Sequence, residues 1–120
     1  MLEGENYLSL ATFRRDGRAV ETCVWFAAED RQLWVFTAGD SGKVKRLRNS
    51  PRGRVAACDA RGTVHGPWHD AQVFIVEDPA RIARANASLL AKYGWQMRLL
   101  DLFSRLFGRY AGRAYLEIRL

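Results

Sequence analysis

Hydroxyl and basic side chains gather in the segment Asp40-Ser41-Gly42-Lys43-Val44-Lys45-Arg46, directly after a strand-like run. Asp40 and Ser41 are both residue types that cap helices, and Val44 and Leu47 have the three-residue spacing of one helix face. Cations are unfavourable at a helix N-terminus, whose free backbone N–H groups favour anions. Amides, a hydroxyl and several cations at one helix start suit a phosphate group. The alternative is a solvated, capped helix that binds no ligand.

Other side chains that could take part in chemistry give weaker signals. Arg61 suits a second phosphate or an acidic substrate tail, or is an ordinary surface arginine. His65 and His69 have a spacing that suits a metal only on a helix, and the glycine and proline between them oppose one, so we predict no metal site. Their role stays open. Cys23 and Cys58 lie in strand-like contexts with no CxxC pattern or histidine partner, which predicts two free thiols.

The elements that must position these residues are mainly strands. We expect six strands, at 7–13, 18–28, 32–37, 54–59, 64–76 and 115–120, with a short helix after the third and two helices before the last. Asp16-Gly17 predicts a hairpin between the first two strands. Asp78-Pro79 predicts the start of the first C-terminal helix. Strands joined by short turns favour a small barrel over a sandwich, because closure removes unpaired edges.

The second C-terminal helix is expected at 95–107. It carries Leu99, Leu102 and Leu106 on one side and Arg98 and Asp101 on the other. This amphipathic pattern predicts a helix that caps the barrel or packs in a dimer. The alternative, a helix that lies on a membrane surface, is also consistent with the pattern, but we expect no membrane partner.

Composition narrows the class of protein. With 120 residues and 48% hydrophobic content, the chain should form one domain over residues 1–120. Its net charge of +6 attracts anions, yet no nucleic-acid motif occurs and aromatic residues do not alternate with the charges, so we expect no nucleic-acid partner. No signal peptide or long apolar stretch is visible, which predicts a cytoplasmic protein. Nucleophile-elbow, Rossmann and Walker motifs are absent, so we predict no catalytic side chain, consistent with a cofactor that carries the chemistry.

Three segments are distinctive: Leu8-Ser9-Leu10-Ala11-Thr12-Phe13-Arg14-Arg15-Asp16-Gly17, Val24-Trp25-Phe26, and Asp40 to Asn49. In this order they resemble the pyridoxamine 5'-phosphate oxidase-like split-barrel superfamily. Cys58 to Gly62, Gly66-Pro67-Trp68 and Lys92-Tyr93-Gly94 are similar to the branch of deazaflavin (coenzyme F-420)-dependent oxidoreductases. The resemblance extends from Tyr7 to Leu120.

This resemblance implies a mainly β, six-stranded split β-barrel of the FMN-binding type. It further implies a homodimer that holds FMN or coenzyme F-420 in grooves across the interface. It maps the phosphate-binding Thr…Ser-x-Lys segment onto Thr37, Ser41 and Lys43, with Lys45 or Arg46 as helpers. Two features depart from the family pattern at the pocket rim: Gly53, which we expect to lengthen the connection from Pro51 to Val55, and His69-Asp70.

The resemblance also places the strand of Val24, Trp25 and Phe26 along the isoalloxazine ring. Because neighbouring side chains of a strand point to opposite faces, we expect Trp25 rather than Phe26 to lie nearer the cofactor groove. We therefore predict a flavin- or deazaflavin-dependent oxidoreductase that transfers hydride to a small organic acceptor. A non-catalytic cofactor- or haem-binding barrel is the alternative. The substrate and the choice between the two cofactors stay open.

Overall fold

Antiparallel strands make up most of the fold. The computed structural model describes residues 4–29, 32–39, 41–106 and 113–120. This part of the chain contains seven strands: β1 (Tyr7–Phe13), β2 (Ala19–Val24), β3 (Phe26–Glu29), β4 (Gln32–Ala38), β5 (Arg52–Cys58), β6 (His69–Val76) and β7 (Arg113–Arg119). Its three helices are α1 (Gly42–Asn49), α2 (Pro79–Tyr93) and α3 (Trp95–Leu106). The predicted mainly β class is confirmed.

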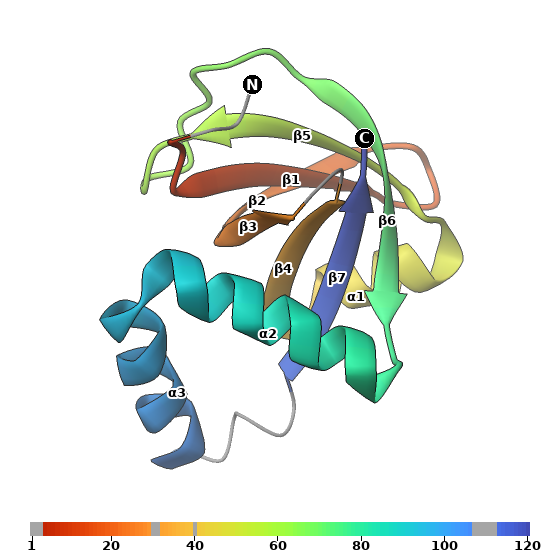
Figure 1. Ribbon diagram of the computed structural model, residues 1–120. Helices are drawn as coiled ribbons and strands as arrows, with labels where there is room; N and C mark the ends of the chain where they lie inside the picture. Colours follow the sequence, from red (N-terminus) through yellow and green to blue (C-terminus); the bar gives the residue numbers. More distant parts are fainter. Residues whose placement is uncertain (1–3, 30–31, 40, 107–112) are drawn as a thin grey trace.

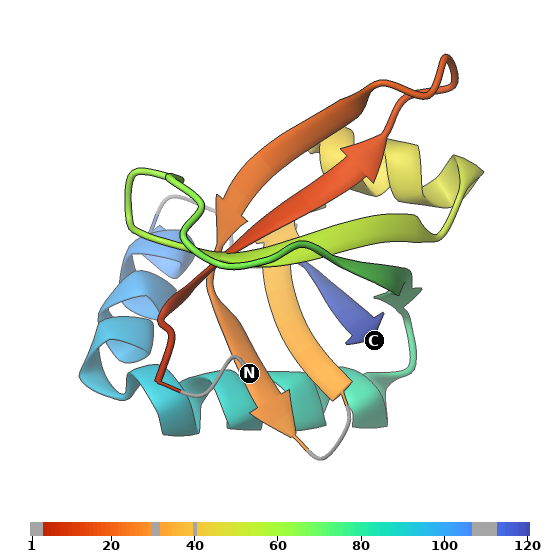
Figure 2. The ribbon, with the colours of Figure 1, turned by 90° about the horizontal axis from the view of Figure 1, so that it is seen from above.

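The strands form one strongly curved sheet in the order β2-β1-β5-β6-β7-β4-β3, and all its neighbours are antiparallel. Figure 1 shows β1, β2 and β5 crossing above β4 and β7, while α2 passes in front of the lower parts of β4 and β7. The view from above shows the same crossing at a steep angle (Figure 2). The curvature encloses a first core cluster, in which Leu8, Leu10, Val35, Val55 and Leu116 are fully buried.

A second core cluster lies on the opposite face of β4, under α2. Alternation along β4 sends Leu33 and Val35 into the first cluster and Trp34 and Phe36 into the second. Trp34 is fully buried there. Side chains at neighbouring positions of β4 therefore pack into two different core clusters.

The expected return strand over residues 18–28 is interrupted at Trp25, so the sheet has seven strands rather than six. β2 pairs with β1 and β3 pairs with β4, on opposite edges of the sheet, so the chain must change partners at this residue. The backbone N–H of Phe26 donates to the hydroxyl of Tyr93 at 2.9 Å, which satisfies a donor that the break leaves unpaired.

Two other sequence expectations shift in the structure. The strand expected over residues 64–76 begins only at His69, because Val64 forms just an isolated bridge with Cys58. Gly53 does not lengthen a loop: it is buried within β5, opposite Thr12. A Cβ atom at Gly53 would lie 2.8 Å from Cγ2 of Val73 and 3.3 Å from the carbonyl oxygen of Ala11. Close packing of the strands accounts for this glycine.

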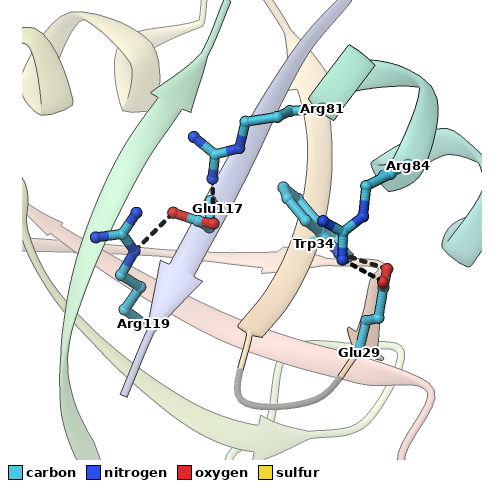
Figure 3. Close-up of polar contacts among 6 residues, drawn as sticks. All are labelled: Glu29, Trp34, Arg81, Arg84, Glu117 and Arg119. Carbon is cyan, nitrogen blue, oxygen red and sulfur yellow. Dashed lines mark hydrogen bonds and ion pairs between the residues drawn. The ribbon is translucent and has the colours of Figure 1, made fainter. Parts of the chain in front are cut away.

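Two carboxylates tie α2 to the sheet (Figure 3). Glu117 of β7 is fully buried and is bound by Arg81 from α2 and by Arg119, whose Nε donates to it at 2.7 Å. Glu29 of β3 accepts hydrogen bonds from Arg84, from Trp34 at 3.2 Å and from the hydroxyl of Ser88 at 2.8 Å. The predicted cap of α2 is confirmed, since Oδ1 of Asp78 accepts from the N–H of Ala80 at 3.1 Å.

α3 packs within the chain by the side opposite to its leucine stripe. Met97 is fully buried, and Asp101 accepts a hydrogen bond from Arg113 at 2.8 Å. The leucine side does not cap the barrel of its own chain, since Leu102 is 55% and Leu106 is 69% exposed, and its packing in a dimer stays a prediction. Among the helices in the described ranges, none has the length and apolar character needed to cross a membrane.

Candidate functional site

The first turn of α1 presents free backbone donors. Ser41 is its N-cap, with an extended backbone, and its Oγ accepts from the N–H of Val44 at 3.5 Å. The N–H of Ser41 donates to the carbonyl of Ala38 at 3.1 Å, so a tight turn connects β4 to the helix. The N–H groups of Gly42 and Lys43 have no carbonyl acceptor within the helix. Asp40, the other predicted cap, lies outside the described residues.

The side chain of Arg46 folds back over this turn. Its Nε donates to Oγ1 of Thr12 at 2.6 Å, and Thr12 is fully buried in β1. A Cβ atom at Gly42 would lie only 2.7 Å from Nη1 of Arg46. Glycine at this position therefore leaves room for the guanidinium beside the helix start, and the buried hydroxyl holds it there.

Within the part of the chain that the structure describes, no acidic side chain pairs with the cations of this turn. Burial lowers the pKa of Lys43 below its ordinary value, and the positive charge of Arg46 lowers it further. Burial, followed by the charge of Arg14, lowers the pKa of Arg46 in the same way. The first turn of α1 contains no acidic residue, and no carboxylate of the described ranges forms an ion pair with these three cations. A bound anion would relieve both the mutual repulsion and the unfavourable helix dipole.

The remaining residues predicted for this site lie around it. Thr37 is half-buried in β4, one residue before the turn that leads to Ser41. Lys45 is exposed on α1, and its backbone N–H donates to the carbonyl of Ser41 at 3.3 Å. The structure thus brings Ser41, Lys43 and Arg46 together at the helix start, while Lys45 faces solvent.

The predicted ring contacts lie elsewhere in the chain. Val24 is buried in the first core cluster. Trp25 is half-buried and stacks on Tyr93 with ring centroids 4.4 Å apart, and it meets the edge of Phe36 at 6.2 Å. Since Phe36 and Thr37 are neighbours in β4, they point to opposite faces of the sheet. Within one chain, Trp25 and the α1 turn are therefore not parts of one pocket.

Arg61 also lies far from α1. It is exposed in the turn after β5, whereas α1 precedes the other end of that strand. The length of β5 separates the two ends by about 20 Å. His65 is exposed and bonds to Glu5 at 2.9 Å, and His69 opens β6 opposite Val55. No group of three metal-ligating side chains occurs among the described residues.

Comparison with known proteins assigns this chain to a family. The family model described as pyridoxamine 5'-phosphate oxidase matches residues 1–113. The chain belongs to the pyridoxamine 5'-phosphate oxidase family. The resemblance seen in the sequence is thereby confirmed at the level of the split-barrel superfamily.

Solved structures share the fold of this family member. Rv2991, a conserved hypothetical protein of Mycobacterium tuberculosis, is 24% identical, with a TM-score of 0.69 over 95% of this chain and 72% of that one. The haem storage protein HutZ of Vibrio cholerae is 14% identical, with a TM-score of 0.74 over 98% and 82%. The FAD-binding protein mll6688 of Mesorhizobium loti is 19% identical, with a TM-score of 0.64 over 99% and 83%. No curated protein matches the sequence. At these identities the likenesses show the fold alone.

Two residues beside the start of α1 were not predicted as parts of the site. Thr12 and Arg14 belong to β1 and the hairpin after it, and they approach α1 only through the tertiary fold. Thr12 is 34 residues from its partner Arg46 in the sequence. No local pattern signals such a contact in this pyridoxamine 5'-phosphate oxidase family member, although the segment of Thr12 was part of the resemblance.

Proposed function

We propose that the protein is a flavin-type oxidoreductase that binds FMN or coenzyme F-420 and transfers hydride between the cofactor ring and a small organic acceptor. One observation carries the proposal: in a chain of the pyridoxamine 5'-phosphate oxidase family, Lys43 and Arg46 stand together at the open start of α1 and form no ion pair with any carboxylate that the structure describes. The bound cofactor supplies the hydride chemistry, and the protein binds and orients it.

In this proposal the α1 turn holds the cofactor phosphate. The N–H groups of Gly42 and Lys43 donate to phosphate oxygens, together with the hydroxyl of Ser41 and the ammonium of Lys43. The guanidinium of Arg46 adds charge-assisted hydrogen bonds. Its Nε is already bound to Thr12 at 2.6 Å, so little side-chain freedom is lost when an anion binds. Thr37 borders the site, and exposed Lys45 contributes long-range attraction.

The choice between the two cofactors depends on what lies beyond the phosphate. Both cofactors need the same anchor. A longer anionic tail, such as that of coenzyme F-420, would give the chain's surplus of arginines more to bind, which favours the deazaflavin. The FAD-binding protein among the similar structures supports a flavin in this fold.

We further propose that the working form is a homodimer. Trp25 and Arg61 lie away from the α1 turn of their own chain, so they can contact the same cofactor molecule only if the second subunit supplies them. The exposed leucine side of α3 is available for contacts between subunits. Sedimentation of the purified protein tests this part separately.

A second candidate is a non-catalytic barrel that binds haem or another cofactor ring. The likeness to the haem storage protein HutZ favours it. It differs from the first candidate in its spectrum and in turnover. A flavin or deazaflavin absorbance band, and mass spectrometry of the molecule released on denaturation, would support the oxidoreductase. A haem spectrum of the purified protein would support the second candidate. Reoxidation of the reduced cofactor by added acceptors would separate an enzyme from a carrier.

The site itself is tested by reversing one charge. Lys43→Glu should abolish retention of FMN and coenzyme F-420, because it places a carboxylate against the phosphate. Arg48→Glu is the matched control, since Arg48 is exposed in the last turn of the same helix and the charge change is the same. Equilibrium titration of both variants gives the comparison, with circular dichroism to verify folding. Equal affinities for the two variants would refute the assignment.

A further inference from the structure

Two thiols from strands that are not neighbours meet on one face of the sheet. Cys23 of β2 lies opposite Ser9, and Cys58 of β5 lies opposite Tyr7. Ser9 and Tyr7 are two residues apart in β1 and share a face, so both cysteines project on that same side. The Sγ atoms are 3.9 Å apart, and the thiol of Cys58 donates to Sγ of Cys23.

A rigid turn covers this thiol pair. Oδ1 of Asp59 accepts from the N–H groups of Arg61 and Thr63, each at 2.9 Å, and the carbonyl of Asp59 accepts from the N–H of Gly62 at 2.9 Å. Gly62 has a φ of +87°, and a Cβ atom there would lie 4.0 Å from Cβ of Cys23. Cys23 is an exposed residue and Cys58 is buried, so solvent reaches the pair from the Cys23 side.

The sheet opposes a disulfide between these two thiols. β1 lies between β2 and β5, and two strand spacings separate the backbones by about 9.5 Å. Cα atoms joined by a disulfide are about 4.4–6.8 Å apart. The sulfur atoms would also have to move from 3.9 Å to a bond length of about 2.0 Å. Bond formation would require the three strands to rearrange.

We propose that Cys23 and Cys58 form a two-sulfur site for a soft, thiophilic cation of the Cu(I) type. Two collinear metal–sulfur bonds of about 2.3 Å span about 4.6 Å, so the observed 3.9 Å has to open by only about 0.7 Å. Thiolates select soft metals such as Cu(I). The pair lacks the ligands that a tetrahedral ion such as Zn²⁺ needs, because no third metal-ligating side chain joins it among the described residues.

The binding step is an exchange of protons for the cation. Two S–H bonds break, two metal–sulfur bonds form, and two protons pass to water with no change of oxidation state. Cys23 is exposed and is the accessible first contact, whereas Cys58 is buried beside it and completes the pair.

An anaerobic titration of the reduced protein with Cu(I), in competition with a chromophoric Cu(I) chelator, tests this site. The wild type should bind one equivalent. Cys23→Ser and Cys58→Ala should each weaken binding by at least about 100-fold, since loss of even an outer-sphere partner weakens metal affinity by about 10–100-fold. Because Cys58 is buried, thermal unfolding of each variant must first show a folded protein. Cys23→Ser, at an exposed position, keeps the test valid if Cys58→Ala does not fold.

The proposal is overturned if Cys23→Ser retains wild-type Cu(I) affinity. It is also overturned if the wild type binds no Cu(I), or if mild oxidation joins the two cysteines in an intramolecular disulfide, detected by mass as the loss of two hydrogens. The pair lies at the opposite end of β5 from α1, so it shares no residue with the proposed phosphate anchor, although the turn beside it contains Arg61.

Discussion

Gly42→Ala should separate cofactor affinity from stability. The new methyl group would lie 2.7 Å from Nη1 of Arg46, so the guanidinium must move away from the start of α1. Alanine favours a helix over glycine by up to about 1 kcal/mol, which offsets any loss at the hydrogen bond to Thr12. We therefore expect the free energy of unfolding to change by less than about 1 kcal/mol.

The affinity for the cofactor should fall much more. A hydrogen bond to a charged group contributes about 1.5–3 kcal/mol. Loss of one such bond between Arg46 and the phosphate corresponds to about a 10- to 150-fold weaker Kd. Fluorescence titration with FMN and with coenzyme F-420 measures this loss, and chemical denaturation measures stability on the same samples.

A double-mutant cycle shows whether the effect passes through Arg46. If it does, Gly42→Ala should cause no further loss of affinity in an Arg46→Gln background. Wild-type affinity for Gly42→Ala would refute the reasoning. The reasoning would also be refuted if the losses of affinity from Gly42→Ala and Arg46→Gln were fully additive, because Gly42 would then act on the cofactor independently of Arg46.

Three further predictions concern the scaffold and are measured by chemical denaturation. Glu117→Gln should cost about 3 kcal/mol at neutral pH, because it leaves two arginines without their buried carboxylate. Burial raises the pKa of Glu117, but the hydrogen bonds from Arg81 and Arg119 outweigh burial and hold the pKa below 4.5. The stability lost in Glu117→Gln should therefore become smaller as the pH falls below 4.5. A loss that stays the same at low pH would contradict this linkage. Tyr93→Phe should cost about 1–3 kcal/mol, because the buried N–H of Phe26 loses its acceptor; no loss would mean another acceptor takes over. Gly53→Ala should cost about 1–3 kcal/mol through its clash with Val73, and an unchanged stability would show that β5 can yield.

Local signals in the sequence predicted the elements where short-range chemistry decides the structure. The cap at Asp78 and the cap at Ser41 depend on hydrogen bonds within two or three residues. The hairpin at Asp16-Gly17 depends on a glycine with a φ of +91°. Such contacts are encoded in neighbouring residues, so their positions follow from residue type and order.

The rest of the structure depends on contacts between distant segments. Trp25 ends one strand because the chain changes pairing partners there, which no local pattern specifies. The burial of Met97 instead of the leucine stripe follows from how α3 meets α2 and β7. The approach of Cys23 to Cys58 and of Thr12 to Arg46 likewise requires the sheet register. The start of α1 was predictable from the sequence, whereas its contacts with Thr12 and Arg14 were not.

The central claim is that the cationic start of α1 binds a cofactor phosphate, and the dissociation constants of FMN and riboflavin test it most directly. These two ligands share the ring and differ by the phosphate. Wild-type protein should prefer FMN by at least about tenfold, equivalent to about 1.4 kcal/mol, and Lys43→Glu should abolish this preference. Equal affinity of the wild type for both ligands, or a preference that survives in Lys43→Glu, would contradict the account.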